Sequence, residues 1–114
     1  MESTRQHKVA KQLQRDLAEI LQKEYNMIFK GLLLTVTTVR VSPDFGYAKA
    51  YVSVFPFDRH EEVLALLDKH NWAIRKSLGS RIKHQLKLVP ELEFFIDDSL
   101  EYIENIDRAM REKK

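Results

Sequence analysis

The side chains that could support acid–base, nucleophilic or metal chemistry are few in this sequence, and their spacing favours structural roles. Asp97 and Asp98 form a carboxylate pair that could serve a hydrolase, but they stand between an expected strand and an expected helix, where Asp is a common N-cap. The four histidines lack the spacing of a helical zinc site, and no serine lies in a G-x-S-x-G setting. No P-loop or G-x-G-x-x-G sequence is present either. We therefore expect no enzyme activity, cofactor or metal, and hydrolysis at the two aspartates is the weakest of three hypotheses.

The segment 71–87, NWAIRKSLGSRIKHQLK, indicates a different chemistry, the binding of phosphate groups, because it has five formal positive charges and no acid. On a helix with about 100° per residue, one apolar stripe contains Ile74, Leu78, Ile82 and Leu86. Lysines on the opposite face can each meet a phosphate as a point charge, and Gly79 would let a sugar–phosphate backbone approach closely. A solvated helix face is the alternative, and the absence of acids favours nucleic-acid binding over it. The candidate residues of this segment are Arg75, Lys76, Gly79, Ser80, Arg81, Lys83 and Lys87.

Three further cations could extend this surface from the N-terminal helix. Lys8, Lys11 and Arg15 lie opposite an apolar stripe that begins at Val9, so they should face away from the core. Two acids follow in the same helix, and a solvated face therefore explains these cations as well as RNA contact does. Arg40, at the end of an expected strand, is a weaker candidate for RNA contact.

The acids gather in another part of the chain. The segment 91–107 contains seven acids and no base, although the whole chain of 114 residues has a net charge of only +2. Such segregation would steer a polyanion toward the basic side of the molecule and repel it from the other side. It also supports a rival hypothesis, in which the chain is a protein-interaction module whose acidic end docks a basic protein. The acidic residues of that hypothesis are Glu91, Glu93, Asp97, Asp98 and Glu101.

The first half of the chain should position these groups with a helix followed by a β-hairpin. Ser3 and Gln6 have the spacing of a capping box, and apolar residues then recur at intervals of three and four. The sequence LLLTVTTVRVS favours a strand, and in the turn SPDFG we expect Gly46 to tolerate a positive φ. The next strand, YAKAYVSVF, alternates so that its alanines and valines face the core. Its other face alternates tyrosine with lysine, a pattern that can stack bases but that also covers the margin of a sheet.

The second half should add two helices, a third strand and a final helix. Asp58 is expected to cap a helix over DRHEEVLALLDKH, and the basic helix follows. VPELEFFID alternates as a strand, and Asp98 with Glu101 predicts a capped helix toward the C-terminus. The order α-β-β-α-α-β-α predicts an α+β fold in a single domain over residues 1–114, with an ordered core of about 5–108.

The composition favours the cytoplasm. The chain has no cysteine, which removes disulfides and thiolate metal sites, and it has no apolar run long enough to span a membrane. The N-terminal sequence lacks the apolar segment of a signal peptide. We therefore expect a soluble cytoplasmic protein, and a monomer.

Three segments carry a resemblance to a known family. An α-β-β-α-α-β order with a basic helix pair is the topology of a type II KH domain, but the G-x-x-G loop of RNA-binding KH modules is absent. The segments VRVSPDFGYAKAYVSVF, IRKSLGSRI and LVPELEFFIDDSLEY, in that order, closely resemble the ribosome-binding factor A family over about residues 5–108. The block VPEL-x-F-x-x-DDSLEY is the most specific part of this resemblance.

The resemblance implies a KH-like protein that binds the immature 30S subunit and its 16S rRNA. It implies assistance in late 16S rRNA maturation, including processing of the 5′ end, with most importance in the cold and with a GTPase partner for release. It implies action by binding rather than by catalysis, and the partner of the rival hypothesis would then be a basic ribosomal protein. In this family a helix–kink–helix, often with Ala-x-Gly at the kink, replaces the G-x-x-G loop. The kink position here is His70, Asn71 and Trp72, where Asn71 could adopt the left-handed conformation.

Overall fold

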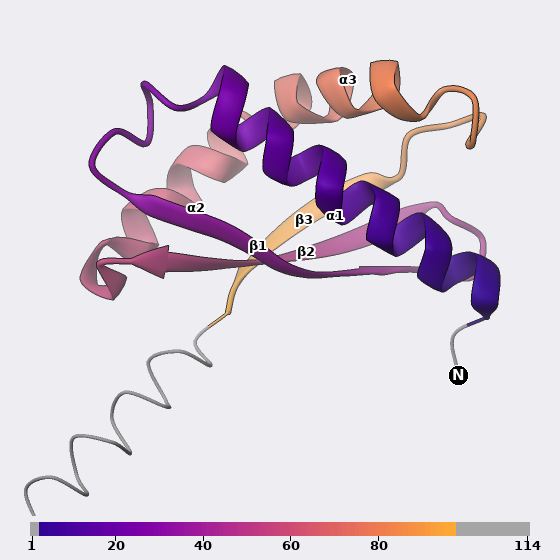
Figure 1. Ribbon diagram of the computed structural model, residues 1–114, viewed down its shortest axis with the longest axis horizontal. Coiled ribbons are helices and arrows are strands. Elements are labelled where there is room, and N and C mark those ends of the chain that lie inside the picture. Colours follow the sequence, from indigo (N-terminus) through magenta and orange to yellow (C-terminus); the bar gives the residue numbers. More distant parts are fainter. Residues whose placement is uncertain (1–2, 98–114) are drawn as a thin grey trace, which may run out of the picture.

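The computed structural model describes residues 3–97, which form three α-helices and one three-stranded sheet (Figure 1). In chain order the elements are α1 (Thr4–Glu24), β1 (Leu33–Val41), β2 (Tyr47–Phe55), a 3-10 helix η1 (Phe57–Arg59), α2 (His60–Lys69), α3 (Asn71–Ile82) and β3 (Glu91–Ile96). This order confirms the predicted α+β, KH-like class. The predicted final helix, with Asp98 and Glu101, lies outside the described residues.

The sheet has the order β1-β2-β3, with β1 antiparallel to β2 and β2 parallel to β3. A register shift at Thr37 separates the pairs Val36↔Val52 and Thr38↔Tyr51. Helices α1 and α3 lie on the same side of the sheet, as Figure 1 shows, and the alternate residues of β2 turn toward them. Those residues are Ala48, Ala50, Val52 and Val54, all buried as predicted.

Helix α1 is anchored at its first turn. The Ser3 hydroxyl accepts a hydrogen bond from the Gln6 amide, and the Gln6 side chain accepts one from the Ser3 amide, which confirms the capping box. The amide of the Gln6 side chain also donates to the carbonyl of Val41, 3.1 Å away and buried, so the start of α1 is joined to the end of β1. This bond fixes the direction in which the basic half of α1 crosses the sheet.

Local expectations fail at the hairpin turn and at the start of α2. Phe45, with φ 59°, adopts the left-handed conformation expected of Gly46, while Asp44 accepts a hydrogen bond from the Gly46 amide 3.0 Å away. Asp58 lies within the 3-10 helix and does not cap α2, whose N-cap residue, Arg59, makes no side-chain capping bond. Within the described residues, no helix is both long enough and apolar enough to cross a membrane.

Candidate nucleic-acid interface

Helix α3 is shorter than the sequence predicts. It ends at Ile82, and the amides of Gln85 and Leu86 both bond to the Ile82 carbonyl in the turn that follows. Leu86 is still buried, so it fills the expected core position from a turn rather than from a helix. The expectation of one continuous basic helix through Lys87 is therefore wrong, because Lys87 lies in the connection to β3.

The helix break lies at the predicted position, but a different residue makes it. Helix α2 ends at Lys69, and His70 has φ −97° and ψ 8°, values that interrupt the helix without a left-handed residue. Asn71 is therefore not in the left-handed conformation, which among the described non-glycine residues belongs to Phe45 alone. The Asn71 side chain instead donates a hydrogen bond to the Leu92 carbonyl, 2.8 Å away, and this bond joins the kink to β3.

Two predicted phosphate-binding residues face the connection between α3 and β3. Arg75 donates from Nε to the Pro90 carbonyl at 3.0 Å and from Nη2 to the Val89 carbonyl at 2.9 Å. A Cβ placed on Gly79 would lie 2.7 Å from a methyl group of Val89. The direction in which a Gly79 side chain would point is therefore filled by the chain itself, and contact of Gly79 with a sugar–phosphate backbone stays a prediction.

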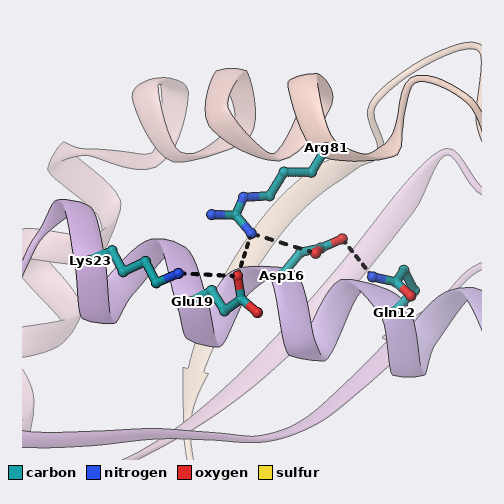
Figure 2. A network of polar contacts seen from close by, with 5 residues as sticks. All are labelled: Gln12, Asp16, Glu19, Lys23 and Arg81. Atoms are coloured by element: carbon teal, nitrogen blue, oxygen red, sulfur yellow. Dashed lines mark hydrogen bonds and ion pairs between the residues drawn. The ribbon is translucent and has the colours of Figure 1, made fainter.

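Arg81 joins α3 to α1 (Figure 2). Its Nη1 lies 2.8 Å from Glu19 and 3.8 Å from Asp16, while Gln12 donates to Asp16 and Lys23 lies 3.9 Å from Glu19. The hydrogen bond from Arg81, and then the charges of Lys23 and Arg81, hold the pKa of the Glu19 carboxyl below its ordinary value. Arg81 therefore has two carboxylate partners on α1.

The remaining side of α3 carries an exposed stripe, which we call the outer stripe, of Trp72, Lys76, Ser80 and Lys83. These residues follow at intervals of four, four and three, so they share one face of the helix and its C-cap. The Nζ of Lys76 lies 5.3 Å from the centroid of the Trp72 ring. Neither lysine forms an ion pair within residues 3–97, so both charges are available to an outside partner.

The cations of α1 line a groove that reaches the turn after α3. This groove has a volume of about 660 Å³ and is lined by Arg5, His7, Lys8, Val9, Lys11, Gln12, Arg15 and Gln85. A smaller hollow of about 200 Å³ includes His7, Lys11 and Arg40 along the edge of β1. The structure therefore brings the α1 cations, the turn after α3 and Arg40 onto connected surfaces, which the sequence treats as separate segments.

The outward face of the sheet is occupied by contacts of its own. Tyr51 stacks on Phe95 with ring centroids 5.4 Å apart, and the Tyr47 hydroxyl bonds to Glu93, which raises the Tyr47 pKa to about 12. On the acidic side, Asp97 accepts a hydrogen bond of 2.6 Å from Thr37. These contacts give Tyr47, Tyr51 and Asp97 structural partners, whereas the outer stripe has an aromatic ring open to solvent.

Comparison with known protein families identifies the chain. The family model described as "Ribosome-binding factor A" matches residues 5–110, nearly the whole sequence. The chain belongs to the ribosome-binding factor A family.

Curated members of the ribosome-binding factor A family match along their length. The protein from Christiangramia forsetii is 41% identical over 99% of this chain and 87% of its own sequence. The one from Chlorobaculum tepidum is also 41% identical, over 98% of this chain and 92% of its own sequence. The family assignment therefore rests on the whole domain rather than on one motif.

Solved structures of ribosome-binding factor A have the same fold. The crystal structure of the Thermus thermophilus protein has a TM-score of 0.69 at 30% identity and covers 80% of this chain and 94% of its own. A Thermus thermophilus homology model, fitted into a cryo-EM map of a complex of the 30S subunit with ribosome-binding factor A, has a TM-score of 0.64 at 30% identity and covers 78% of this chain and 91% of its own. The solution structure from Thermotoga maritima has a TM-score of 0.62 at 26% identity, with 83% of this chain and 89% of its own covered.

Sequence reasoning missed one exposed residue of this candidate interface. Trp72 is interpreted from the sequence only as part of the kink, yet its side chain is 71% exposed beside Lys76. The helical spacing of Trp72, Lys76 and Lys83 could have revealed it, because a wheel that starts at Asn71 places all three on one side.

Proposed function

We propose that this member of the ribosome-binding factor A family binds the immature 30S subunit through its 16S rRNA and assists late maturation of that rRNA, including the 5′ end. It acts in the bacterial cytoplasm, by binding and without catalysis. Family membership supports this proposal, and so does the 30S complex into whose map the Thermus thermophilus relative was fitted. Greater importance in the cold and release by a GTPase partner are parts of the proposal that rest on the family resemblance alone.

One observation carries the RNA side of the proposal: exposed cations that form no ion pair within residues 3–97 gather on connected surfaces. Lys8, Lys11 and Arg15 lie at intervals of three and four on α1, and all are exposed. Lys83 and Lys87 flank the turn whose Gln85 lines the same groove. A strand of RNA backbone presents regularly spaced phosphates, and such unpaired cations can replace its condensed counterions.

The RNA-binding set is therefore refined. Lys8, Lys11, Arg15, Lys76, Ser80, Lys83 and Lys87 remain the proposed contacts, with Arg40 at the margin. Arg75, Gly79 and Arg81 remain near this surface, but their described contacts are with Val89, Pro90, Asp16 and Glu19. We propose that these three shape the surface rather than bind phosphate.

The test is a salt titration of binding to immature 30S subunits. The variant Lys11→Glu with Lys83→Glu should bind more weakly, and the slope of log K against log salt should fall by about 1.5 to 2, because two phosphate contacts are lost. The control is Lys30→Glu with Lys49→Glu, which changes the net charge equally on exposed residues outside the groove and the outer stripe. An equal loss of binding and slope in both variants, or in neither, would show that the groove is not the RNA surface.

A further inference from the structure

Trp72 stands out among the exposed apolar side chains. It is the only tryptophan of the chain, and 71% of its side chain is exposed in the first turn of α3. Tryptophan is highly buried on average, and it is enriched where proteins meet a partner, because its large ring also has a polar N–H group. The break at His70 separates α2 from α3, so Trp72 lies at the start of the second helix.

The surroundings of Trp72 are cationic and polar. The outer stripe continues from the ring to Lys76, Ser80 and Lys83, and the Lys76 ammonium lies 5.3 Å from the ring centroid. An aromatic ring flanked by unpaired cations matches the way proteins hold single-stranded RNA, in which the ring stacks on a base and the cations follow the backbone. An apolar protein partner would be favoured by apolar neighbours along the stripe, and the stripe has none.

We propose that Trp72 stacks on an unpaired base of rRNA while Lys76 and Lys83 contact the phosphates on either side of it. This inference rests on the proposed function and adds to it the kind of RNA that is bound: a single-stranded or bulged element, rather than the backbone of a duplex alone. The Lys76 ammonium, which lies over the ring in the free protein, moves to a phosphate when the base takes its place. The cation–π contact thus keeps the ring and the lysine side by side before RNA arrives.

The experiment uses the fluorescence of the full chain, since all tryptophan emission comes from Trp72. The probes are a single-stranded oligoadenylate and the same strand paired with oligouridylate. Stacking predicts that the single strand quenches the emission and that the duplex quenches it much less at equal occupancy, with occupancy followed by a dye on the RNA. Equal quenching by the two probes would contradict stacking.

Variants separate the ring from its surroundings. Trp72→Ala should weaken binding of the single strand about tenfold, whereas Trp72→Phe should retain most of the affinity because it keeps a π face. The matched control is Phe55→Ala, which removes another exposed aromatic side chain, 63% exposed at the end of β2, and should change nothing. Loss of affinity by the same factor in the Ala and Phe variants of Trp72 would overturn the proposal.

Binding to immature 30S subunits distinguishes failure of stacking from failure of the proposed function. Suppose that Trp72→Ala binds both the oligonucleotide and the 30S subunit as the parent does, while Lys11→Glu with Lys83→Glu binds both more weakly. Stacking is then refuted and the proposed function stands. If Trp72→Ala weakens binding to the subunit but not to the oligonucleotide, Trp72 docks on a ribosomal protein and the proposal is wrong. If none of these substitutions weakens binding to the subunit, both proposals fail.

Discussion

Gly79 shows how a single residue acquires its role from a distant part of the chain. Its missing side chain leaves the space that a methyl group of Val89 fills, ten positions along the sequence. In the same place Arg75 donates two hydrogen bonds to the carbonyls of Val89 and Pro90. Both residues hold the connection against α3, and this fixes where the turn 83–87 meets α1.

Gly79→Ala tests the packing role. Alanine is a better helix former than glycine by about 1 kcal/mol, yet overpacking typically costs about 1 to 3 kcal/mol. We therefore expect the free energy of unfolding to fall by roughly 1 kcal/mol, as measured by urea denaturation. Adding Val89→Ala should remove most of that loss relative to Val89→Ala alone, since the clash is then absent. A Gly79→Ala variant more stable than the parent would show that Val89 yields without cost.

Arg75→Lys tests the division between shaping and binding residues. Lysine cannot span both carbonyls as the guanidinium does, so we expect a loss of about 1 to 2 kcal/mol in the free energy of unfolding. Affinity for the 30S subunit should stay the same under conditions where the variant is folded. Lys76→Met is the matched comparison: it should leave stability unchanged and weaken subunit binding. If Arg75→Lys bound the 30S subunit more weakly while it was folded, Arg75 would itself be a phosphate-binding residue.

At the scale of elements, α1 and α3 are joined by charge as well as by their apolar faces. Arg81 reaches Glu19 and Asp16, and the Ser77 hydroxyl donates to Glu24 at 2.7 Å. The acids in the second half of α1 therefore bind side chains of α3, while the cations in its first half remain exposed. The two halves of one helix have different tasks, which explains the change of charge along it.

The α1–α3 link should depend on pH in the acid range. Arg81 lowers the pKa of Glu19 below its ordinary 4.5 in the folded state, so its contribution to stability is complete above that value. The contribution is lost as the pH falls through the lower, folded pKa. We expect the melting temperature of the parent to fall more steeply than that of Arg81→Met when the pH drops below about 4.5. The Glu19 carboxylate, whose pKa is lowered, is exposed, so the difference will be small.

The control for this measurement is Lys30→Met, which removes an exposed cation that forms no ion pair within the described part of the chain. Its melting temperature should follow that of the parent at every pH. Parallel curves for the parent and Arg81→Met would mean that the ion pair contributes nothing to stability.

At the scale of the whole molecule, the charges of the described residues are unevenly distributed. Exposed cations that form no ion pair within the described residues are concentrated on α1, the outer stripe and the turn 83–87, with single ones such as Lys30 elsewhere, while Glu91 and Glu93 are exposed on β3. A near-neutral protein with such a distribution approaches a polyanion in a preferred orientation. Electrostatics thus favours an encounter through α1 and α3.

Replacing both Glu91 and Glu93 with Gln distinguishes this picture from docking through the acidic end. Removing two negative charges should increase the association rate with 30S subunits at low salt and have little effect at high salt. Stopped-flow or surface-based kinetics at several salt concentrations would measure the association rate. A protein-interaction module that docks through these acids predicts a lower affinity instead, and that result would favour the rival hypothesis.

The local pattern of the sequence determines much of this protein. The capping box at Ser3, the alternation of β2 and the apolar spacing of Ile74, Leu78 and Ile82 all predict the elements that form. Each of these signals is contained within one element, where backbone geometry alone relates spacing to a shared face. The family resemblance, carried by the same local segments, follows from the sequence for that reason.

The tertiary structure alone decided which basic residues are free. Arg81 meets acids of the distant helix α1, Arg75 bonds to carbonyls 14 and 15 positions away, and Leu86 enters the core from a turn that periodicity cannot distinguish from a helix. A run of charges looks the same in the sequence whether its members are solvated or paired, because pairing depends on what the fold brings alongside. The side of α3 on which Trp72 lies could be read from a helical wheel, but the tertiary structure shows that no other element covers it, since the side chain is 71% exposed.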